Sequence, residues 1–304
     1  MGPLRTPAAF CGVVGLRPTP GTVPKTASVI AYWPLSVEGP MARSVADLRL
    51  MLSAMAGSDP RDPLSGPVGD RGLAASGSVD LGAVTAFVSE DLGFAPMDDR
   101  MRRLFRERLD LFAGGFGRCA RRDPRMHDAD RVFEVLRAVG FLAAHKDKYD
   151  NNRDQVGPNV AANVELGLTY SAADVAWAAA RHTEIYRDFL DFMADCDVLI
   201  TPAAAAPPFG KDELYPAEIN GRPLETYIRW VAIAYGITLT GHPAVVLPCG
   251  LDWTGAPFGL QLVGRRGREG ELLAVAEALE SELERFPECR RPVPDLDALA
   301  RRTG

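Results

Sequence analysis

Short apolar runs alternate with amphipathic helical patterns along most of this 304-residue chain, and this alternation restricts the fold more than any other feature. β-Branched and apolar runs predict strands at 83–89, 117–122, 197–202, in the second half of 236–250, and at 256–267. Helical periodicity predicts helices at 98–112, 130–144, 171–194 and 269–286. The pattern therefore predicts an α/β fold with a mixed, mostly parallel β-sheet flanked by helices.

The composition permits a sizeable core, because 47% of the residues are hydrophobic and 24% are charged. We find no internal repeat, and we expect one domain over residues 1–304. The polar stretch 287–304 is predicted to be a peripheral C-terminal tail.

Two segments have the pattern of a helix start. Ser44 is followed by Asp47, and Ser171 by Asp174, so each serine precedes an acid at the position where a capping box needs it. Residues 1–43 differ, because they are rich in proline and glycine and have little helical period. We expect short extended pieces there, and no helix.

Charge and cysteine content exclude several classes of partner. The net charge is −6, and no lysine–arginine cluster is interleaved with aromatic residues, so nucleic acid is not an expected partner. No apolar run approaches the roughly 20 residues that span a bilayer, so no membrane association is expected. The five cysteines are scattered without a C-x-x-C pair, which favours reduced thiols, a cytoplasmic location and no zinc site.

Common catalytic motifs are missing from the sequence. It has no G-x-S-x-G nucleophile elbow, P-loop, strand-linked G-x-G-x-x-G or H-E-x-x-H. His145 and His182 lie among polar residues and are predicted to be solvated, whereas His242 is predicted to be a turn residue before a strand. These residues alone define no complete catalytic set.

Two N-terminal blocks carry a family resemblance. Residues 4–19 read LRTPAAFCGVVGLRPT, and residues 39–47 read GPMARSVAD. Three later blocks follow in the same order: DVLITP at 197–202, LTGHPAVVLPCG at 239–250 and GLQLVGR at 259–265. Together they resemble the amidase signature family over essentially the whole chain.

The resemblance implies a hydrolase that cleaves carboxamide C–N bonds through a Ser–cis-Ser–Lys triad. In such a site a neutral lysine, its pKa lowered by its surroundings, accepts a proton through a bridging serine from the nucleophilic serine. Backbone N–H groups of a glycine-rich turn stabilise the oxyanion of the tetrahedral intermediate. No metal or organic cofactor is implied.

The nucleophile position of the family pattern is occupied by Pro3, which has neither a hydroxyl nor a backbone N–H. Gly2 corresponds to the last residue of the oxyanion turn, and Arg5 is expected to support the loop rather than bind substrate. The family's lysine and bridging serine precede the block that starts at Leu4, where this chain has three residues. We therefore expect a truncated, inactive form with no catalytic residue of its own.

Three residues are potential replacements for the missing groups, and we favour none of them. Lys146 lies in a highly charged segment and Lys211 follows a proline-rich loop, so neither environment favours a lysine of lowered pKa. Cys11 matches an ordinary cysteine of the family pattern and is predicted to be a buried core thiol.

The remaining candidates are residues of a pocket wall. Tyr32 and Trp33 follow a proline- and glycine-rich loop and either line an acyl pocket or simply pack in the core. Pro202 and Ala203 follow a predicted strand and are also candidate lining residues. The segment after Pro202 and the span 215–236 lie outside the family blocks, where we expect substrate choice to be determined.

Two functions remain open. The first is an amidase-family hydrolase of small-molecule amides, in a truncated and inactive form. The second is a non-catalytic pseudoenzyme that acts as a binding or scaffold module; a homodimer is compatible with either. A partner chain that supplies a missing half is disfavoured, because it would not replace Pro3. Residues 31–38 do not resemble the tRNA-dependent amidotransferase subunits, so that role is not favoured.

Overall fold

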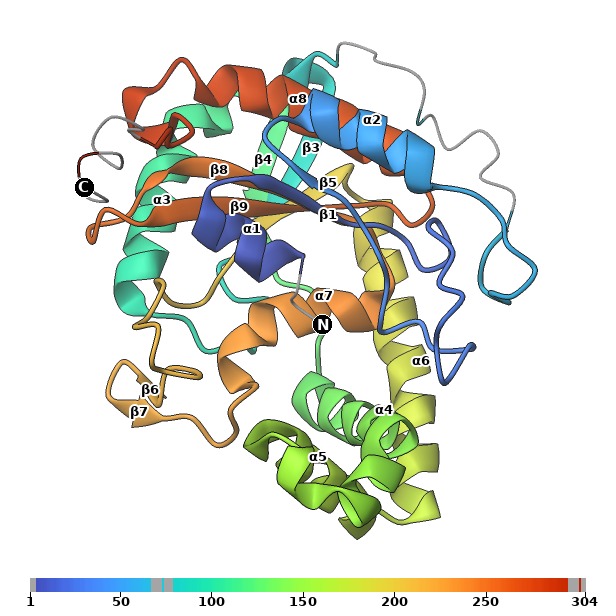
Figure 1. Cartoon of the computed structure of the whole chain (residues 1–304). Helices are drawn as coiled ribbons and strands as arrows, with labels where there is room; N and C mark the ends of the chain where they lie inside the picture. The colour runs from blue at the N-terminus through green and yellow to red at the C-terminus, as the bar shows by residue number, and fades with distance from the viewer. Residues whose placement is uncertain (1–3, 67–72, 74–78, 295–300, 302–304) are drawn as a thin grey trace.

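A computed structural model describes residues 4–66, 73, 79–294 and 301. A seven-stranded sheet in the order β2-β1-β8-β9-β5-β3-β4 forms its centre (Figure 1). The strands are β1 (Val14–Arg17), β2 (Met41–Ala42), β3 (Thr85–Val88), β4 (Arg118–Arg121), β5 (Val198–Pro202), β8 (Ala244–Leu251) and β9 (Pro257–Gly264). A separate hairpin consists of β6 (Glu218–Ile219) and β7 (Arg222–Pro223).

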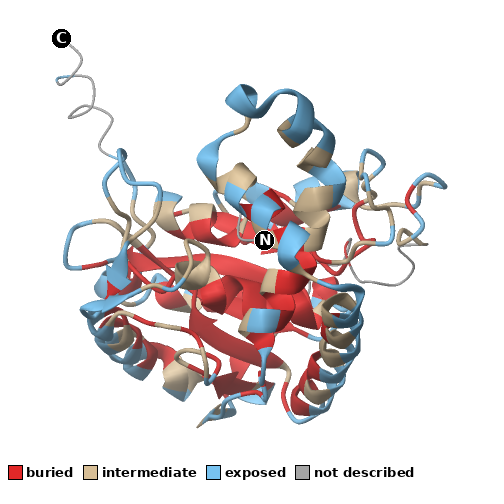
Figure 2. Cartoon of the chain, turned by 90° about the horizontal axis from the view of Figure 1, so that it is seen from below, coloured by how far each residue is buried: buried red, intermediate tan, exposed pale blue. Residues whose placement is uncertain are grey.

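Helices cover both faces of the sheet, as predicted. They are α1 (Arg5–Cys11), α2 (Val45–Met55), α3 (Asp99–Phe112), α4 (Ala129–Asn151), α5 (Pro158–Thr169), α6 (Ala172–Ala194), α7 (Ala232–Thr240) and α8 (Glu269–Leu283). Helices α2 and α8 lie on one face, while α1 lies on the other with α7 beneath it and the α4–α6 group farther out (Figure 1). Buried residues concentrate in the sheet and on the helix faces turned toward it (Figure 2).

The sheet is mixed, as the sequence predicts, but it is not mostly parallel. Four of its six strand pairs are antiparallel, and only β3 pairs in parallel, with β4 and β5. Strands β8 and β9 fold back on each other through a short turn closed by Asp252, whose backbone N–H donates to the Ala256 carbonyl. Strand–helix alternation does not determine strand direction where a short turn replaces a crossover.

Both predicted helix starts are confirmed. The Ser44 side chain accepts a hydrogen bond from the Asp47 backbone N–H at the start of α2. At the start of α6, Ser171 and Asp174 form a reciprocal capping box. These bonds satisfy N–H groups that have no partner within the helix.

Helix α1 contradicts the expectation that the N-terminal 43 residues contain no helix. It has seven residues, too few to reveal a helical period, and it ends where Gly12 adopts a left-handed φ of 63°. A helix this short is marginal on its own and depends on tertiary packing.

The C-terminal segment begins as a turn against the sheet. Residues Pro287–Cys289 form a short 3-10 helix, η5, in which Cys289 is fully buried. Most of the residues after Pro294 lie outside the described ranges, so the predicted extent of the tail remains a prediction. Within the described ranges, every helix is too short or too polar to span a bilayer.

Candidate active site around helix α1

Helix α1 begins two residues after Pro3, the position at which the resemblance predicts the family's nucleophile. Gly2 and Pro3 lie outside the described residues, and Leu4 is the N-cap of the helix. The described part of the candidate site therefore begins with α1 and the contacts that hold this helix on the sheet.

Arg5 is almost fully buried, with 1% of its surface exposed, and it ties α1 to two other elements. Its Nη1 donates to Gln261 Oε1 of β9 at 2.6 Å, while Nη2 donates to the Ala234 carbonyl and to Thr238 Oγ1 of α7, both at 2.7 Å. Gln261 Nε2 in turn donates to Thr201 Oγ1 of β5 at 2.9 Å. One guanidinium thus links α1, α7, β9 and β5.

Burial is the main electrostatic influence on Arg5. Desolvation lowers the pKa of its guanidinium well below the usual value, and the nearby positive charge of Arg17 lowers it further. Arg17 is also buried, which lowers its pKa to about 10, and it donates to the carbonyls of His242, Pro34 and Thr238. These hydrogen bonds are consistent with loop support by Arg5, although its exact role remains a prediction.

Small residues let α1 lie directly on the sheet. Ala8 and Ala9 pack with Ala203 and Val246 in a buried cluster beneath the helix. A Cβ on Gly15 would stand 2.6 Å from the Ala8 Cβ, so a larger residue there would displace α1. The close approach of helix and strand therefore requires glycine on β1.

The pocket-wall candidates lie in different surroundings. Pro202 and Ala203 are buried at the end of β5, and the Ala203 N–H donates to the Gly259 carbonyl at 2.9 Å. This places Ala203 directly against α1. Trp33 is half-buried, with its indole against Gly140 of α4, whereas Tyr32 is 75% exposed. Their role in a pocket remains a prediction.

An aromatic cluster that the sequence does not predict lies beside α1. Phe10 stacks on Trp230 with ring centroids 6.2 Å apart, and Phe209 meets both rings edge-on. Trp230 lies in the span 215–236, where we expected substrate choice to be determined. The spacing of these residues in the sequence indicates nothing about their contact, because three distant segments supply them.

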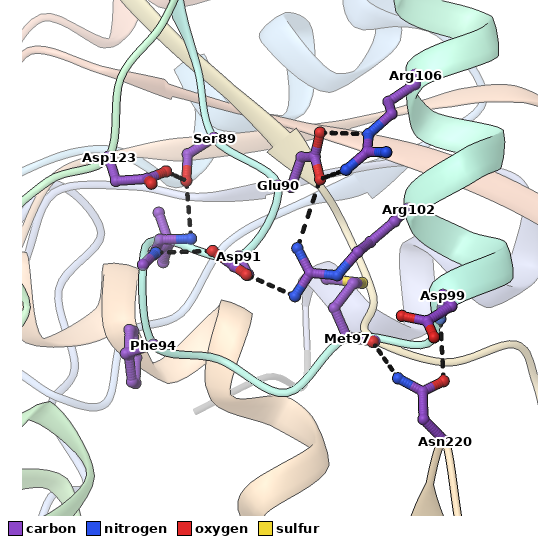
Figure 3. Close-up of polar contacts among 12 residues, drawn as sticks. Ser89, Glu90, Asp91, Phe94, Met97, Asp99, Arg102, Arg106, Asp123 and Asn220 are labelled. Atoms are coloured by element: carbon purple, nitrogen blue, oxygen red, sulfur yellow. Dashed lines mark hydrogen bonds and ion pairs between the residues drawn. The ribbon is translucent and has the colours of Figure 1, made fainter.

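A cavity of about 650 Å³ lies between the β3–α3 loop, the β6–β7 hairpin and the segment before α7. Arg106 and Arg102 both pair with Glu90, and Arg102 also pairs with Asp91 (Figure 3). The Asn220 amide joins the hairpin to the β3–α3 loop and to α3: its Nδ2 donates to the Met97 carbonyl, and its Oδ1 accepts from the Asp99 N–H, both at 3.0 Å (Figure 3).

The charges at the edge of this cavity belong mainly to a structural network. The pKa of the Glu90 carboxyl is lowered mainly by the hydrogen bond from Arg106. Burial has a smaller effect in the opposite direction. Ser89 donates to Asp123 Oδ1 at 2.5 Å and accepts from the Leu92 N–H, which closes the turn after β3 (Figure 3). These contacts hold the β3–α3 loop in place, and none of them indicates a catalytic role.

Two expectations about polar side chains are wrong. Cys11 is exposed, because it ends α1 and the buried face of that helix consists of other residues. His182 is not solvated: its Nε2 lies 2.8 Å from the Leu239 carbonyl, and burial lowers its pKa. The prediction failed because α7 packs against α6 at this point. His242 precedes β8, as predicted, but it is fully buried and lies one residue after the turn at Gly241.

Both lysines that were considered as replacements lie at the surface, and the expectation that neither acts as the base stays a prediction. Lys146 forms an ion pair with Asp150 on the outer surface of α4, and Lys211 is exposed in a turn. Over the described part of the chain, no group of three or more His, Cys, Asp or Glu side chains is arranged to hold a metal ion.

The seven-stranded mixed sheet, with helix α1 anchored on it through Arg5, is an α/β fold. The profile of the Amidase family matches residues 2–273, and the chain belongs to that family.

Individual relatives agree with this assignment. The chain is 28% identical to an acylamidase of Rhodococcus erythropolis over 92% of its own length and 59% of the relative's. It is 35% identical to a subunit of the glutamyl-tRNA(Gln) amidotransferase of Anaeromyxobacter dehalogenans over 94% of its length and 62% of the relative's. The chain thus spans about three fifths of the curated relatives it matches.

The fold is shared with solved structures. A bacterial aryl acylamidase belonging to the amidase signature enzymes superposes with a TM-score of 0.78 at 23% identity. The match covers 95% of this chain and 63% of that structure.

Proposed function

We propose that this chain provides the amidase scaffold for small carboxamide substrates but does not itself cleave them, because Pro3 occupies the nucleophile position. Membership of the Amidase family supports the substrate class. The observation that carries the proposal is the sequence Gly2-Pro3-Leu4-Arg5, in which proline stands where the family pattern has serine. Proline offers neither an attacking hydroxyl nor an N–H for an oxyanion.

The packing of α1 supports a retained scaffold. Arg5 keeps its buried hydrogen bonds to β9 and α7, and Ala203 keeps its contact under the helix. Proline in place of serine at position 3 is therefore compatible with the packing of α1 on the sheet. The alternative of a non-catalytic binding or scaffold module rests on the same observation.

Location and partners are part of the proposal. The described cysteines are free thiols, which is typical of a reducing cytoplasm. Relatives include amidotransferase subunits, so a role in a larger complex is a second candidate. The amidotransferase subunit of Anaeromyxobacter dehalogenans is 35% identical to this chain. We nevertheless favour a small-molecule amide over a tRNA-linked substrate, on the expectation that residues 31–38 differ from those subunits.

Product release tests the lack of catalysis. We expect the purified 304-residue chain to release no ammonia or arylamine from aliphatic, aryl and cyclic-oligomer amides above an enzyme-free blank. Clear release by the unaltered chain would contradict the proposal. Pro3→Ser, which restores the hydroxyl, is the matched variant that shows whether the proline alone prevents the reaction.

Binding distinguishes the scaffold from a decayed enzyme. A carboxamide that raises the thermal unfolding midpoint without product formation would favour a binding module, because a ligand that binds the folded state stabilises it. A chain that folds cooperatively but shows no such shift with any amide would contradict carboxamide recognition.

A further inference from the structure

Two cysteines that are 40 positions apart meet beneath the C-terminal segment. Cys249 lies in β8 and Cys289 ends η5, and both side chains are fully buried. Strand β8 has an irregular register between Pro248 and Leu251, where Gly250 adopts a φ of +78°. A Cβ on Gly250 would lie 1.8 Å from the Glu288 carbonyl oxygen, so the two backbones are in direct contact here.

The two thiols interact with each other and with a cation. A Cβ on Gly250, the residue after Cys249, would lie 3.5 Å from the Cys289 Cα, which brings the two cysteines together. The interaction with Cys249 lowers the pKa of Cys289, whereas burial raises the pKa of Cys249. The charge of Arg108 on α3 lowers the pKa of both thiols, and Arg108 Nη2 donates to the Leu251 carbonyl at 3.3 Å. The Glu288 carboxylate opposes this effect on Cys289.

We propose that Cys249 and Cys289 are a redox-sensitive dithiol that closes to a disulfide when the protein meets hydrogen peroxide. The Cys289 thiolate attacks one peroxide oxygen and breaks the O–O bond, which gives a sulfenic acid and releases hydroxide. The Cys249 sulfur then attacks the Cys289 sulfur, and the sulfenic oxygen leaves as water with the Cys249 proton. The proton that Cys289 loses when its thiolate forms neutralises the released hydroxide, so the two thiols are oxidised and one peroxide is reduced to two waters.

The disulfide would fasten the C-terminal segment over helix α1. A Cβ on Gly12, the C-cap of α1, would stand 2.9 Å from Pro292 Cγ. Arg291 Nη1 donates to the Arg43 carbonyl at 3.0 Å, so the same segment also contacts the start of α2. Oxidation at Cys289 therefore links the sheet covalently to a segment that packs against the end of α1.

Peptide mapping without reductant tests the proposal directly. A Cys11→Ser protein, which lacks the exposed thiol, is treated with increasing hydrogen peroxide and then alkylated and digested. We expect a cross-linked pair of peptides that contain Cys249 and Cys289, lighter by two hydrogen atoms and separated again by dithiothreitol. If both cysteines are instead recovered as separately alkylated thiols at every peroxide concentration that leaves the protein folded, the proposal is wrong.

Variants check the assigned roles. Cys289→Ser is expected to abolish the cross-link, whereas Cys196→Ser should leave it unchanged, since Cys196 is equally buried but contacts Met193. Arg108→Gln is expected to slow cross-linking by about three- to tenfold, and Arg108→Lys to keep most of the rate, because the thiolate fraction sets reactivity. Equal rates for the two Arg108 variants would contradict the role of its charge.

A second readout follows the segment itself. Disulfide closure should slow backbone hydrogen exchange in residues 286–292 and raise the thermal unfolding midpoint relative to the reduced protein. If hydrogen exchange in residues 286–292 were unchanged in the cross-linked protein, the inference that the disulfide holds this segment in place would be wrong.

Discussion

At the scale of single residues, Arg5 is the side chain on which the candidate site depends most. Arg5→Ala removes a buried donor from Gln261, Ala234 and Thr238 at once. Acceptors left unsatisfied in the interior cost about 1–3 kcal/mol each, so we expect a loss of about 3–5 kcal/mol in the free energy of unfolding. Urea denaturation measures this loss.

An exposed arginine is the matched control. Arg61 pairs with Asp59, but its side chain is 72% exposed, so Arg61→Ala is expected to leave the unfolding midpoint unchanged. Similar midpoints for the two variants would show that the buried hydrogen bonds of Arg5 contribute little to stability.

At the scale of elements, the contact between α1 and β1 decides whether the candidate site is formed. Gly15→Ala would place a methyl group 2.6 Å from the Ala8 Cβ and 2.8 Å from the Leu4 carbonyl oxygen. The added methyl group would force α1 away from β1. We therefore expect the free energy of unfolding, measured in urea, to fall by about 1–3 kcal/mol.

A second glycine provides the control for this substitution. A Cβ on Gly57 would meet no atom within 4 Å, and Gly57 has no left-handed φ. Gly57→Ala should therefore be neutral or slightly stabilising, since alanine reduces the freedom of the unfolded chain. If the two variants were equally stable, the tight packing of α1 would be refuted.

At the scale of the whole molecule, buried His242 makes stability depend on pH. Desolvation lowers its pKa to about 4, its Nδ1 lies 2.9 Å from the Thr240 carbonyl, and its Nε2 has no hydrogen-bond partner within the described ranges. The unfolded state binds the proton at a higher pH than the folded state. Stability should therefore fall as the pH drops from about 6.5 to about 4, by up to about 1.4 kcal/mol per pH unit from this group.

The comparison of His242→Asn with the unaltered chain isolates this contribution. We expect the variant to have a shallower fall in unfolding free energy between about pH 6.5 and about pH 5, because asparagine does not titrate. His127→Asn, at an exposed position, is the control. A slope as steep in His242→Asn as in the unaltered chain would exclude His242 as the cause.

Local signals explain the parts of the fold that were predictable. The capping residues Ser44 and Ser171 act on N–H groups within three positions, and the buried run 197–202 needs no distant partner to be recognised as β5. By contrast, α1 has too few residues to show a helical period in the sequence. The antiparallel direction of β8 and β9 follows from the hairpin that joins them, and the alternation of helices and strands does not predict it.

The candidate site was predictable only in part, for the same reason. The blocks 4–19 and 39–47 locate the nucleophile loop and identify Pro3 without any coordinates. They do not reveal that Phe10 stacks on Trp230 or that the backbone after Cys249 packs against Cys289. These pairs are far apart in the sequence, and no residue pattern along the chain records a contact between them.

The sequence by itself determined the family, the order of the main strands and helices, and the prediction that Pro3 occupies the nucleophile position. Each of these depends on residue identity or on a period of a few positions. Only the tertiary structure decided that Arg5 joins Gln261 across 256 positions, that most strands pair antiparallel, and that two cysteines meet beneath the C-terminal segment. Burial and backbone packing create those contacts, and both exist only once distant segments have come together.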